Sequence, residues 1–435
     1  MTIRHSKNVR TKIAVIGLGF VGLPLSIMFA EKGFHVTGID MDERKVTQLQ
    51  HSFSYIGDID DTRLKNVLDS GHFLATTNFD RLRDVDAVII CVPTPLTKQK
   101  TPDLRYITSA GEEIQKRLQK GQLVVLESST FPGTTKEVFL PILEQSGLSV
   151  GKDFFLANSP ERIDPGNNKY SVDEIPKVIG GMTEQCEEVA YSLYKEIYKE
   201  VVPVSSTEAA ELTKLLENTF RFINISFINE LAILSDHLKV DIWEVIGAAA
   251  SKPYGFMPFY PGPGIGGHCI PVDPIYLQWK LQQLETNSDF IGLSELTNQR
   301  MTDYIVYRTE ELLKPNRSIS SAKILIYGVT YKKDVADTRD SSAIEIIEQF
   351  NQKGATIYYH DPYIPSLNIG DHLYVSADLT EDVLGEVDCV IILTDHSVIP
   401  LEKILTHASL VFDTRNVTKS HQVKSSHVRR LGAGS

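Results

Sequence analysis

Two stretches near opposite ends of the chain carry the same order of apolar runs, turns and acidic residues. The run "KIAVIGLGFVG" at 12–22 has a counterpart in "KILIYGVTYKKD" at 323–334, and "GFHVTGID" at 33–40 has one in "GATIYYHD" at 354–361. A third pair is "DVDAVIICVPT" at 84–94 and "EVDCVIILTD" at 386–395. Short, continuously apolar runs are typical of buried parallel strands in α/β proteins. The repeat therefore predicts two Rossmann-like domains with doubly wound parallel sheets.

The first turn of the N-terminal copy has the spacing of a dinucleotide-binding turn. Its sequence "GLGFVG" follows a predicted strand and opens an apolar helix, with Gly17, Gly19, Phe20, Val21 and Gly22 forming the turn. Glycine lets the backbone approach a pyrophosphate at the helix N-terminus, where free N–H groups favour negative charge. This turn predicts a nucleotide cofactor.

An acidic residue indicates whether the nucleotide carries a 2'-phosphate. Asp40 ends the next predicted strand, where a carboxylate accepts a hydrogen bond from a ribose 2'-hydroxyl and repels a 2'-phosphate. We therefore expect NAD. Thr94 and Thr130 follow two further predicted strands and are candidates for cofactor contact, because ligands bind beyond the carboxyl ends of such strands.

The C-terminal copy differs at the corresponding turn. The glycine pattern is absent, and Lys332, Lys333 and Arg339 stand nearby. Cations in place of glycines favour a phosphate that is held by side chains.

The middle of the chain is predicted to be helical. From Ser205, with Glu208 as a possible capping-box partner, no glycine or proline interrupts the sequence up to Val240. A helix of that length usually bridges domains or forms a dimer seam, so we expect a homodimer through it. We therefore expect three domains: an NAD-binding domain at 1–204, a helical dimerisation domain at 205–311 and a second Rossmann-like domain at 312–435.

Lys214, Asn218 and Arg221 lie on one face of this predicted helix, four and seven residues apart. Such a stripe is usually a solvated helix face, and its alternative is a functional site. The residues alone leave both readings open.

Composition excludes several classes of protein. A formal charge of -12 over 435 residues argues against a nucleic-acid binder. The basic start (Arg4, Lys7, Arg10 and Lys12) before "IAVIGLGFVGLPLSIMFA" resembles a signal peptide or anchor, but three glycines in six residues favour strand, turn and helix. Four cysteines without a CxxC pair indicate a reducing cytoplasm.

One cysteine stands in an unusual place. Cys269 lies in "GPGIGGHCIPVDP" at 262–274, a loop that only glycine-rich backbone can build. His268 beside it suggests a metal ligand, but two adjacent ligands without a second cluster rarely make a site. We expect no metal.

The ordered motifs "GLGFVG", "VPTP", "ESSTFPGTT", "SPER", "ELTKLLENTFRFINISFINEL", "GPGIGGHCIPVDP" and "YKKDVADTRDS" resemble those of the UDP-glucose/GDP-mannose dehydrogenase family over nearly the whole chain. The resemblance implies NAD-dependent, four-electron oxidation of a sugar C6 alcohol to a carboxylate, with UDP bound by the C-terminal domain. An aldehyde has no hydride to give to a second NAD until a nucleophile adds to it. Cys269 as thiolate would give a thiohemiacetal and then a thioester.

Matching motif positions imply the remaining roles. Lys214 and Asn218 stabilise an oxyanion, Asp273 and Thr130 position or deprotonate a water, and Glu161 activates the hydrolytic water. Further cofactor contacts are Lys45 and Arg339, and further substrate contacts are Arg162, Arg221, Tyr260 and Lys332. Lys214, Asn218 and Glu161 are expected to touch substrate as well.

Two segments differ from the pattern of the UDP-glucose enzymes in this family, and the difference bears on the choice of substrate. "RIDPGN" follows "SPE", and "GGHCI" surrounds the cysteine, as in the branch that acts on N-acetylated amino sugars for surface polysaccharides. We expect UDP-N-acetylglucosamine, with UDP-glucose, UDP-N-acetylmannosamine or UDP-N-acetylgalactosamine as alternatives. More distant rivals are a two-electron β-hydroxyacid dehydrogenase and a nucleotide-sensing protein with a decayed active site.

Overall fold

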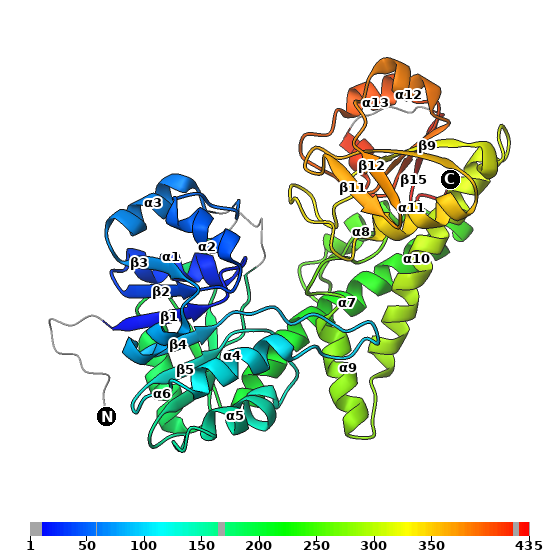
Figure 1. Cartoon of the computed structure of the whole chain (residues 1–435). Helices are drawn as coiled ribbons and strands as arrows, with labels where there is room; N and C mark the ends of the chain where they lie inside the picture. The colour runs from blue at the N-terminus through cyan, green and yellow to red at the C-terminus, as the bar shows by residue number, and fades with distance from the viewer. Residues whose placement is uncertain (1–10, 58, 164–169, 421–425, 435) are drawn as a thin grey trace. The chain divides into compact units, whose positions relative to one another are not determined.

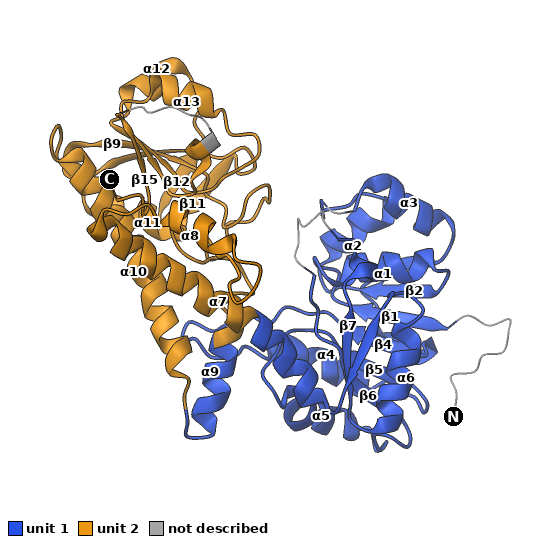
Figure 2. Ribbon diagram, turned by 180° about the vertical axis from the view of Figure 1, so that it is seen from behind, with its two compact units in different colours: residues 1–217, 275–286 blue, residues 218–274, 287–435 orange. Residues whose placement is uncertain are grey.

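The computed structural model describes residues 11–57, 59–163, 170–420 and 426–434. Its two compact units are coloured in Figure 2: unit 1 is Met1–Glu217 with Ile275–Thr286, and unit 2 is Asn218–Pro274 with Asn287–Ser435. Arg4, Lys7 and Arg10, and the "DPGN" stretch at 164–167, lie outside the described residues. The expected boundaries at 204/205 and 311/312 stay a prediction.

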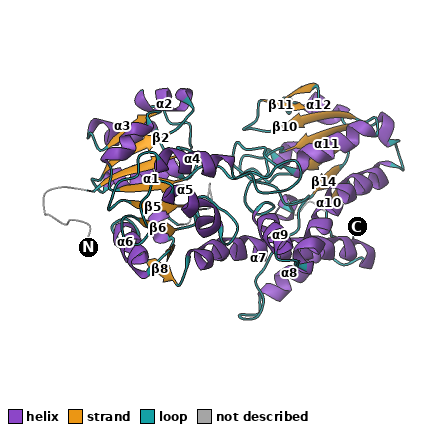
Figure 3. Cartoon of the chain, turned by 60° about the horizontal axis from the view of Figure 1, so that its bottom comes forward, coloured by secondary structure: helices purple, strands orange, loops and turns teal. Residues whose placement is uncertain are grey.

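Unit 1 is built on one eight-stranded sheet, seen edge-on among its helices in Figure 3, with the order β3-β2-β1-β4-β5-β6-β7-β8. Every neighbouring pair is parallel except β6 and β7, which run antiparallel. The strands are β1 (Lys12–Ile16), β2 (His35–Ile39), β3 (Phe73–Thr76), β4 (Ala87–Ile90), β5 (Leu123–Leu126), β6 (Phe155–Asn158), β7 (Lys177–Gly181) and β8 (Val201–Val204). The helices are α1 (Gly22–Glu31), α2 (Glu43–Gln50), α3 (Asp61–Asp69), α4 (Arg105–Gln115), α5 (Leu140–Glu144) and α6 (Glu184–Tyr194), with 3-10 helices at Phe79–Asp84 and Val172–Glu174 and a π-helix at Thr134–Phe139.

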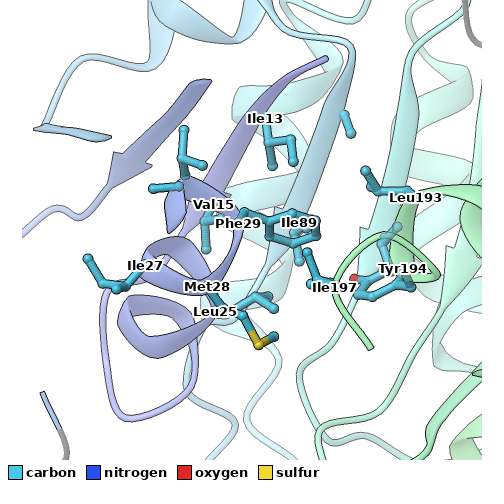
Figure 4. Close-up of a cluster of buried hydrophobic side chains, with 14 of the residues drawn as sticks. Ile13, Val15, Leu25, Ile27, Met28, Phe29, Ile89, Leu193, Tyr194 and Ile197 are labelled. Atoms are coloured by element: carbon cyan, nitrogen blue, oxygen red, sulfur yellow. The ribbon is translucent and has the colours of Figure 1, made fainter. Parts of the chain in front are cut away.

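Both faces of this sheet are buried at its centre, where β4 (AVII) and β5 (LVVL) are apolar and buried at every position. Ile13 and Val15 of β1 join the cluster formed with α1 and α6, which Figure 4 shows in close-up. Ala14 and Ile16 point the other way and join the cluster formed with α4 and α5. Helices on both faces of a mostly parallel sheet confirm the predicted doubly wound fold.

Unit 2 combines helices with a five-stranded parallel sheet of order β10-β9-β13-β14-β15. Helices α7 and α10 run along one another (Figure 1), and Ser226 Oγ of α7 donates to the Ser294 carbonyl of α10 at 3.1 Å. The helices are α7 (Thr207–Leu238), α8 (Ile242–Ala250), α9 (Asp273–Gln283), α10 (Asp289–Leu313), α11 (Ser342–Gln352), α12 (Glu381–Glu386) and α13 (Leu401–His407). The strands are β9 (Lys323–Tyr327), β10 (Thr356–His360), β11 (Ser366–Ile369), β12 (His372–Val375), β13 (Cys389–Ile392), β14 (Val411–Asp413) and β15 (Val428–Arg430), with single turns at Ile319–Ser321 and Val417–Ser420. Most of α9 belongs to unit 1, and α7 begins there.

The predicted repeat extends to single hydrogen bonds. Asp40 Oδ2, after β2, accepts from the Leu18 amide at 2.9 Å, and Asp361 Oδ2, after β10, accepts from the Val329 amide at 2.7 Å. In the second copy, however, His396 Nε2 also lies 3.1 Å from Asp361 Oδ2, and the aspartate is buried. That carboxylate is therefore engaged within the protein, which fits a turn that binds no second dinucleotide.

Helix α7 corrects one expectation and decides between the two readings of its polar stripe. The Ala209 amide donates to Ser206 Oγ at 3.1 Å, so Ser206 is the cap and the Ser205–Glu208 capping box is wrong by one residue. The stripe is solvated only in part. Lys214 is 7% exposed and Asn218 4%, whereas the apolar Leu216 is 64% exposed; Arg221 is exposed as expected. The helix buries polar side chains and leaves apolar ones uncovered.

Among the described residues, no helix is both long enough and apolar enough to cross a membrane.

Candidate functional site

The nucleotide turn of unit 1 has the backbone geometry that its glycines predict. Gly17 has φ 92°, and a Cβ there would lie 2.6 Å from the Cys91 carbonyl oxygen. A Cβ on Gly22 would lie 1.8 Å from the Gly17 carbonyl oxygen, so only glycine permits this entry into α1. Nothing lies within 4 Å of a Cβ on Gly19, which leaves open space over the turn. The N-cap of α1, Val21, provides no side-chain cap, and Phe20 beside it is exposed. This cradle fits the pyrophosphate of NAD.

Asp40 lies where a ribose-binding carboxylate is expected. Its two oxygens accept from the amides of Leu18 and Asp42, both at 2.9 Å, and Lys45 Nζ lies 3.5 Å away. These donors hold the carboxylate beside the turn. Lys45 Nζ also lies 5.8 Å from the centroid of the Tyr55 ring. This predicted cofactor contact therefore lies beside Asp40.

The two predicted threonines lie beyond the carboxyl ends of β4 and β5. Both are buried, and the hydroxyl of Thr130 has no hydrogen-bond partner among the residues that the structure describes. A buried, unpaired hydroxyl costs free energy unless a ligand completes it. The Thr130 loop is fixed by Glu211 of α7, whose oxygens accept from the amides of Gly133 (2.6 Å) and Thr135 (2.8 Å) and from Thr135 Oγ1 (2.6 Å).

Glu161 belongs to a buried group of charges that the sequence analysis missed. Its Oε2 accepts from Lys177 Nζ at 2.9 Å, and Lys177 donates equally to Glu127 Oε2. Burial alone would raise the pKa of Glu161, but Lys177, the Ile163 amide and Lys214 together hold that pKa below its ordinary range. Burial raises the pKa of Glu127 to about 7. Cys91 lies beside this group, just past the end of β4.

Arg162 is engaged with its own unit. One guanidinium nitrogen donates to the Pro176 carbonyl at 2.6 Å, and another lies 2.6 Å from Glu217 on α7. These contacts tie the "SPER" segment to α7, so any contact with substrate would share a guanidinium already in use.

Lys214 and Asn218 lie one turn apart on α7, on its buried face. Within unit 2, Asn218 Nδ2 donates to Asp273 Oδ2 at 2.5 Å. Asp273 is 2% exposed and begins α9, and its amide donates to the Cys269 carbonyl at 2.9 Å. Three predicted residues of unit 2, namely Asn218, Cys269 and Asp273, are therefore linked.

The Cys269 loop lies against the turn that follows β9. Cβ atoms on Gly266 and Gly267 would approach the side chain of Tyr331 within 2.9 and 2.6 Å, and the Gly267 amide donates to the Arg339 carbonyl at 3.2 Å. Two asparagines of the helices hold the other end of the loop, because Asn229 accepts from the Gly262 amide (2.9 Å) and Asn298 from the Ile265 amide (2.7 Å). The thiol of Cys269 remains exposed.

A pocket of unit 2 opens beside this loop. It is lined by Pro263, Gly264, Gly266, Thr330, Tyr331, Ser341, Ser342, Ala343, Leu393, Thr394 and Arg415. Arg415 follows β14, and its Nε donates to the Leu393 carbonyl at 2.8 Å. The sequence analysis did not single out Arg415, although it follows an apolar run that ends in "DTR".

Three further residues of unit 2 were predicted to contact ligands: Lys332, Arg339 and Tyr260. Lys332 directly follows Tyr331. Arg339 makes two bonds to Asp337 carboxylate oxygens, at 3.0 and 2.6 Å, so it is braced within its own turn. Tyr260 is 57% exposed and stacks on Trp243 with ring centroids 6.1 Å apart.

No group of three or more His, Cys, Asp or Glu side chains that could hold a metal occurs among the described residues. Burial, with Arg339 as the next cause, lowers the pKa of His268.

Comparisons with known proteins agree with this arrangement. Three domain models of the UDP-glucose/GDP-mannose dehydrogenase family match in order: the NAD-binding domain at residues 11–199, the central domain at 208–300 and the UDP-binding domain at 325–420. A UDP-N-acetyl-D-glucosamine 6-dehydrogenase of Pseudomonas aeruginosa is 36% identical over 389 residues, which cover 89% of this chain and 90% of the relative.

A UDP-N-acetyl-D-mannosamine dehydrogenase of Methanococcus maripaludis is 34% identical and covers 99% of both chains. Among solved structures, a UDP-D-ManNAc dehydrogenase of Pyrococcus horikoshii superimposes with a TM-score of 0.88 at 33% identity, over 97% of this chain and 99% of that one. The chain therefore belongs to the UDP-glucose/GDP-mannose dehydrogenase family and is an NAD-dependent UDP-sugar dehydrogenase.

Proposed function

We propose that this enzyme oxidises the C6 alcohol of a UDP-N-acetylhexosamine, with UDP-N-acetylglucosamine as the preferred substrate, to the uronic acid. The observation that carries the proposal is the exposed thiol of Cys269, on a loop whose glycines pack against the turn after β9. A thiol on so open a loop is accessible to a bulky sugar nucleotide. A dehydrogenase that stops at the two-electron stage has no use for it.

Bound NAD supplies the oxidising power, taking a hydride from C6 of the alcohol first and of the thiohemiacetal later. The chain's own residues handle the protons and the carbon–sulfur bond. Asp273, Thr130 and Lys214 are candidates to receive the alcohol proton in the first half. Thr130 supports this role through its unpaired buried hydroxyl, and Asp273 through its buried carboxylate.

In the second half the Cys269 thiolate adds to the aldehyde carbon, and the carbonyl oxygen becomes an alkoxide. We assign Lys214 and Asn218 to hold that oxygen, because a cation and an amide donor one turn apart on a helix converge on one atom. Oxidation then leaves a thioester, and water cleaves its C–S bond. One hydrogen of the water goes to sulfur, and the other is released as the acid ionises.

We assign the UDP moiety to the pocket of unit 2. Arg415 supplies a positive charge, and Ser341, the N-cap of α11, supplies a hydroxyl beside the free amides of a helix start. Lys332, Tyr260 and Arg221 are assigned as further contacts, and Arg339 as a contact of the cofactor. These assignments follow from the positions of the family motifs.

The choice of sugar is tested by a panel of UDP-N-acetylglucosamine, UDP-N-acetylmannosamine, UDP-N-acetylgalactosamine and UDP-glucose, each assayed for NADH release. We expect the N-acetylglucosamine substrate first and two NADH for each sugar oxidised. The relatives named for UDP-N-acetylmannosamine make that epimer the second candidate. A clear preference for UDP-glucose would contradict the proposal, and one NADH per sugar would favour the β-hydroxyacid dehydrogenase rival.

The assembly we propose is a homodimer through α7. In unit 2 this helix exposes Phe220, Phe227, Leu234 and Leu238, at intervals of seven, seven and four residues, and α10 exposes Phe290, Leu293 and Leu296. Apolar stripes of this kind need cover, and a symmetric second copy is the commonest cover. A cytoplasmic role in surface polysaccharide synthesis fits a soluble sugar-nucleotide product of this class.

A further inference from the structure

The group of buried charges behind Glu161 contains a lysine to which the sequence analysis gave no role. Lys177, at the start of β7, is 2% exposed, and Glu127, beyond β5, is 1% exposed. Because β7 runs antiparallel to β6, its first residue lies at the same sheet edge as the ends of β5 and β6. That reversal is what brings the ammonium between the two carboxylates.

The contacts fix the lysine from two sides. Its Nζ donates to Glu127 Oε2 and to Glu161 Oε2, both at 2.9 Å, while the hydroxyl of Tyr194 donates to the other oxygen of Glu127. Lys177 also lies 5.5 Å from the ring centroids of Tyr194 and Tyr198. An ammonium held by two carboxylates and two aromatic faces has one available position.

The carboxylate of Glu161 is also fixed by hydrogen bonds. Its Oε1 accepts from the amides of Arg162 and Ile163, both at 2.7 Å, and its Oε2 accepts from Lys177. A carboxylate offers about four acceptor positions, so three donors leave one for a water. All three donors favour the ionised form.

We propose that Lys177 is a positioning residue that keeps the Glu161 carboxylate ionised and in one orientation during the acid-forming half of the reaction. The inference rests on the proposed function, in which Glu161 acts on the hydrolytic water. In this account Glu161 orients that water as a fixed hydrogen-bond acceptor. Glu127 and Tyr194 hold the lysine in turn.

The titratable groups that face Glu161 agree with this role. They come from every element around it: Lys177 of β7, Glu127 beyond β5, Cys91 beyond β4, Tyr198 beyond α6 and Lys214 of α7. Burial raises the pKa of Glu161, and among the described residues Lys177 and then Lys214 lower it by their charge. Removing Lys177 takes away the larger of the two opposing charges and favours the protonated acid.

The test removes the ammonium without leaving an unpaired charge behind. Lys177→Met alone would bury two facing carboxylates, so the working variant is Lys177→Met with Glu127→Gln, and Glu127→Gln alone is the matched control. Acid formation from the 6-aldehyde with NAD and reduction of the same aldehyde with NADH are measured from pH 5 to 8. Circular dichroism and thermal stabilisation by NAD report on folding.

In the double variant, acid formation at pH 6 should fall at least about tenfold and recover toward high pH, because Glu161 then takes up a proton. Aldehyde reduction should stay within about twofold of the wild type, since it needs no hydrolytic water. Glu127→Gln alone gives the baseline, and the double variant should lose acid formation relative to it. A double variant with wild-type acid formation at pH 6, or with equal losses of both activities, would overturn the proposal and leave Lys177 a structural ion-pair residue.

A measurement on the unmodified enzyme decides the question should the double variant fail to fold. With Glu161 held ionised, hydrolysis of the thioester on Cys269, followed by quenching and peptide mass, should proceed at a constant rate from pH 7 down to pH 5, since this step needs no thiolate. A hydrolysis rate that falls in this range would overturn the positioning role alone. A wild-type enzyme that forms no acid from any UDP-sugar would overturn the proposed function as well, so the two failures are distinguishable.

Discussion

Replacing Gly266 by alanine should displace the Cys269 loop from the segment after β9 that supports it. An added Cβ would lie 2.5 Å from the Asp340 carbonyl oxygen and 2.9 Å from the Tyr331 Cβ, against about 3.4 Å for an ordinary contact. The loop must therefore move by roughly 0.9 Å (3.4 minus 2.5). Gly266 has no positive φ, so the effect comes from this overlap and not from backbone strain.

Overpacking of this kind costs about 1–3 kcal/mol of unfolding free energy. A displacement of nearly 1 Å at the nucleophile lowers the rate of acid formation by up to about a hundredfold. Urea unfolding and acid formation from the UDP-sugar measure the two effects.

Gly292→Ala on α10 is the matched control. Nothing lies within 4 Å of a Cβ at that position, and alanine in a helix should raise the unfolding free energy by about 0.5–1 kcal/mol. Activity should not change. A Gly266→Ala enzyme with wild-type stability and activity would refute the packing of the Cys269 loop against the turn after β9.

Three further predictions concern the cofactor, the buried charges and the assembly. Asp40→Ala should weaken NAD binding by about 1.5–3 kcal/mol and reduce the preference for NAD over NADP; an unchanged preference would mean that Asp40 does not face the ribose. Burial raises the pKa of Glu127 to about 7, so the folded state keeps a proton that the unfolded state loses above pH 4.5, and stability falls as pH rises toward 7. The stability of Glu127→Gln relative to the wild type should therefore rise by about 1–3 kcal/mol from pH 5 to 8, and a constant difference would contradict this. Phe227→Glu should give a monomer in sedimentation at micromolar concentration while Leu373→Glu, on the exposed β12, stays dimeric; a wild-type monomer would contradict the dimer.

The fold could be predicted because its signals are local. The three repeated runs marked β1, β2 and β4 of the first sheet and β9, β10 and β13 of the second. The glycines of the first turn marked the nucleotide site, since each steric requirement arises within a few residues or from the next strand. The Cys269 loop was recognisable for the same reason.

What the sequence could not predict depends on contacts between distant residues. Lys177 meets partners 50 and 16 residues away, and only the reversed β7 brings them together. Helical periodicity places Lys214 and Asn218 on a polar face, which ordinarily points to solvent. Their burial became visible only with the fold, in which Asp273, 55 residues from Asn218, is its hydrogen-bond partner.

The central claim is that Cys269 is the nucleophile of the acid-forming half, and one Cys269→Ala preparation tests it most directly. Acid formation from the 6-aldehyde with NAD and reduction of the same aldehyde with NADH are measured side by side, with thermal stabilisation by NAD to show that the enzyme is folded. The account predicts that acid formation falls at least about a thousandfold, because neither the thiohemiacetal nor the thioester can form, while aldehyde reduction is retained. Retention of both activities would contradict it.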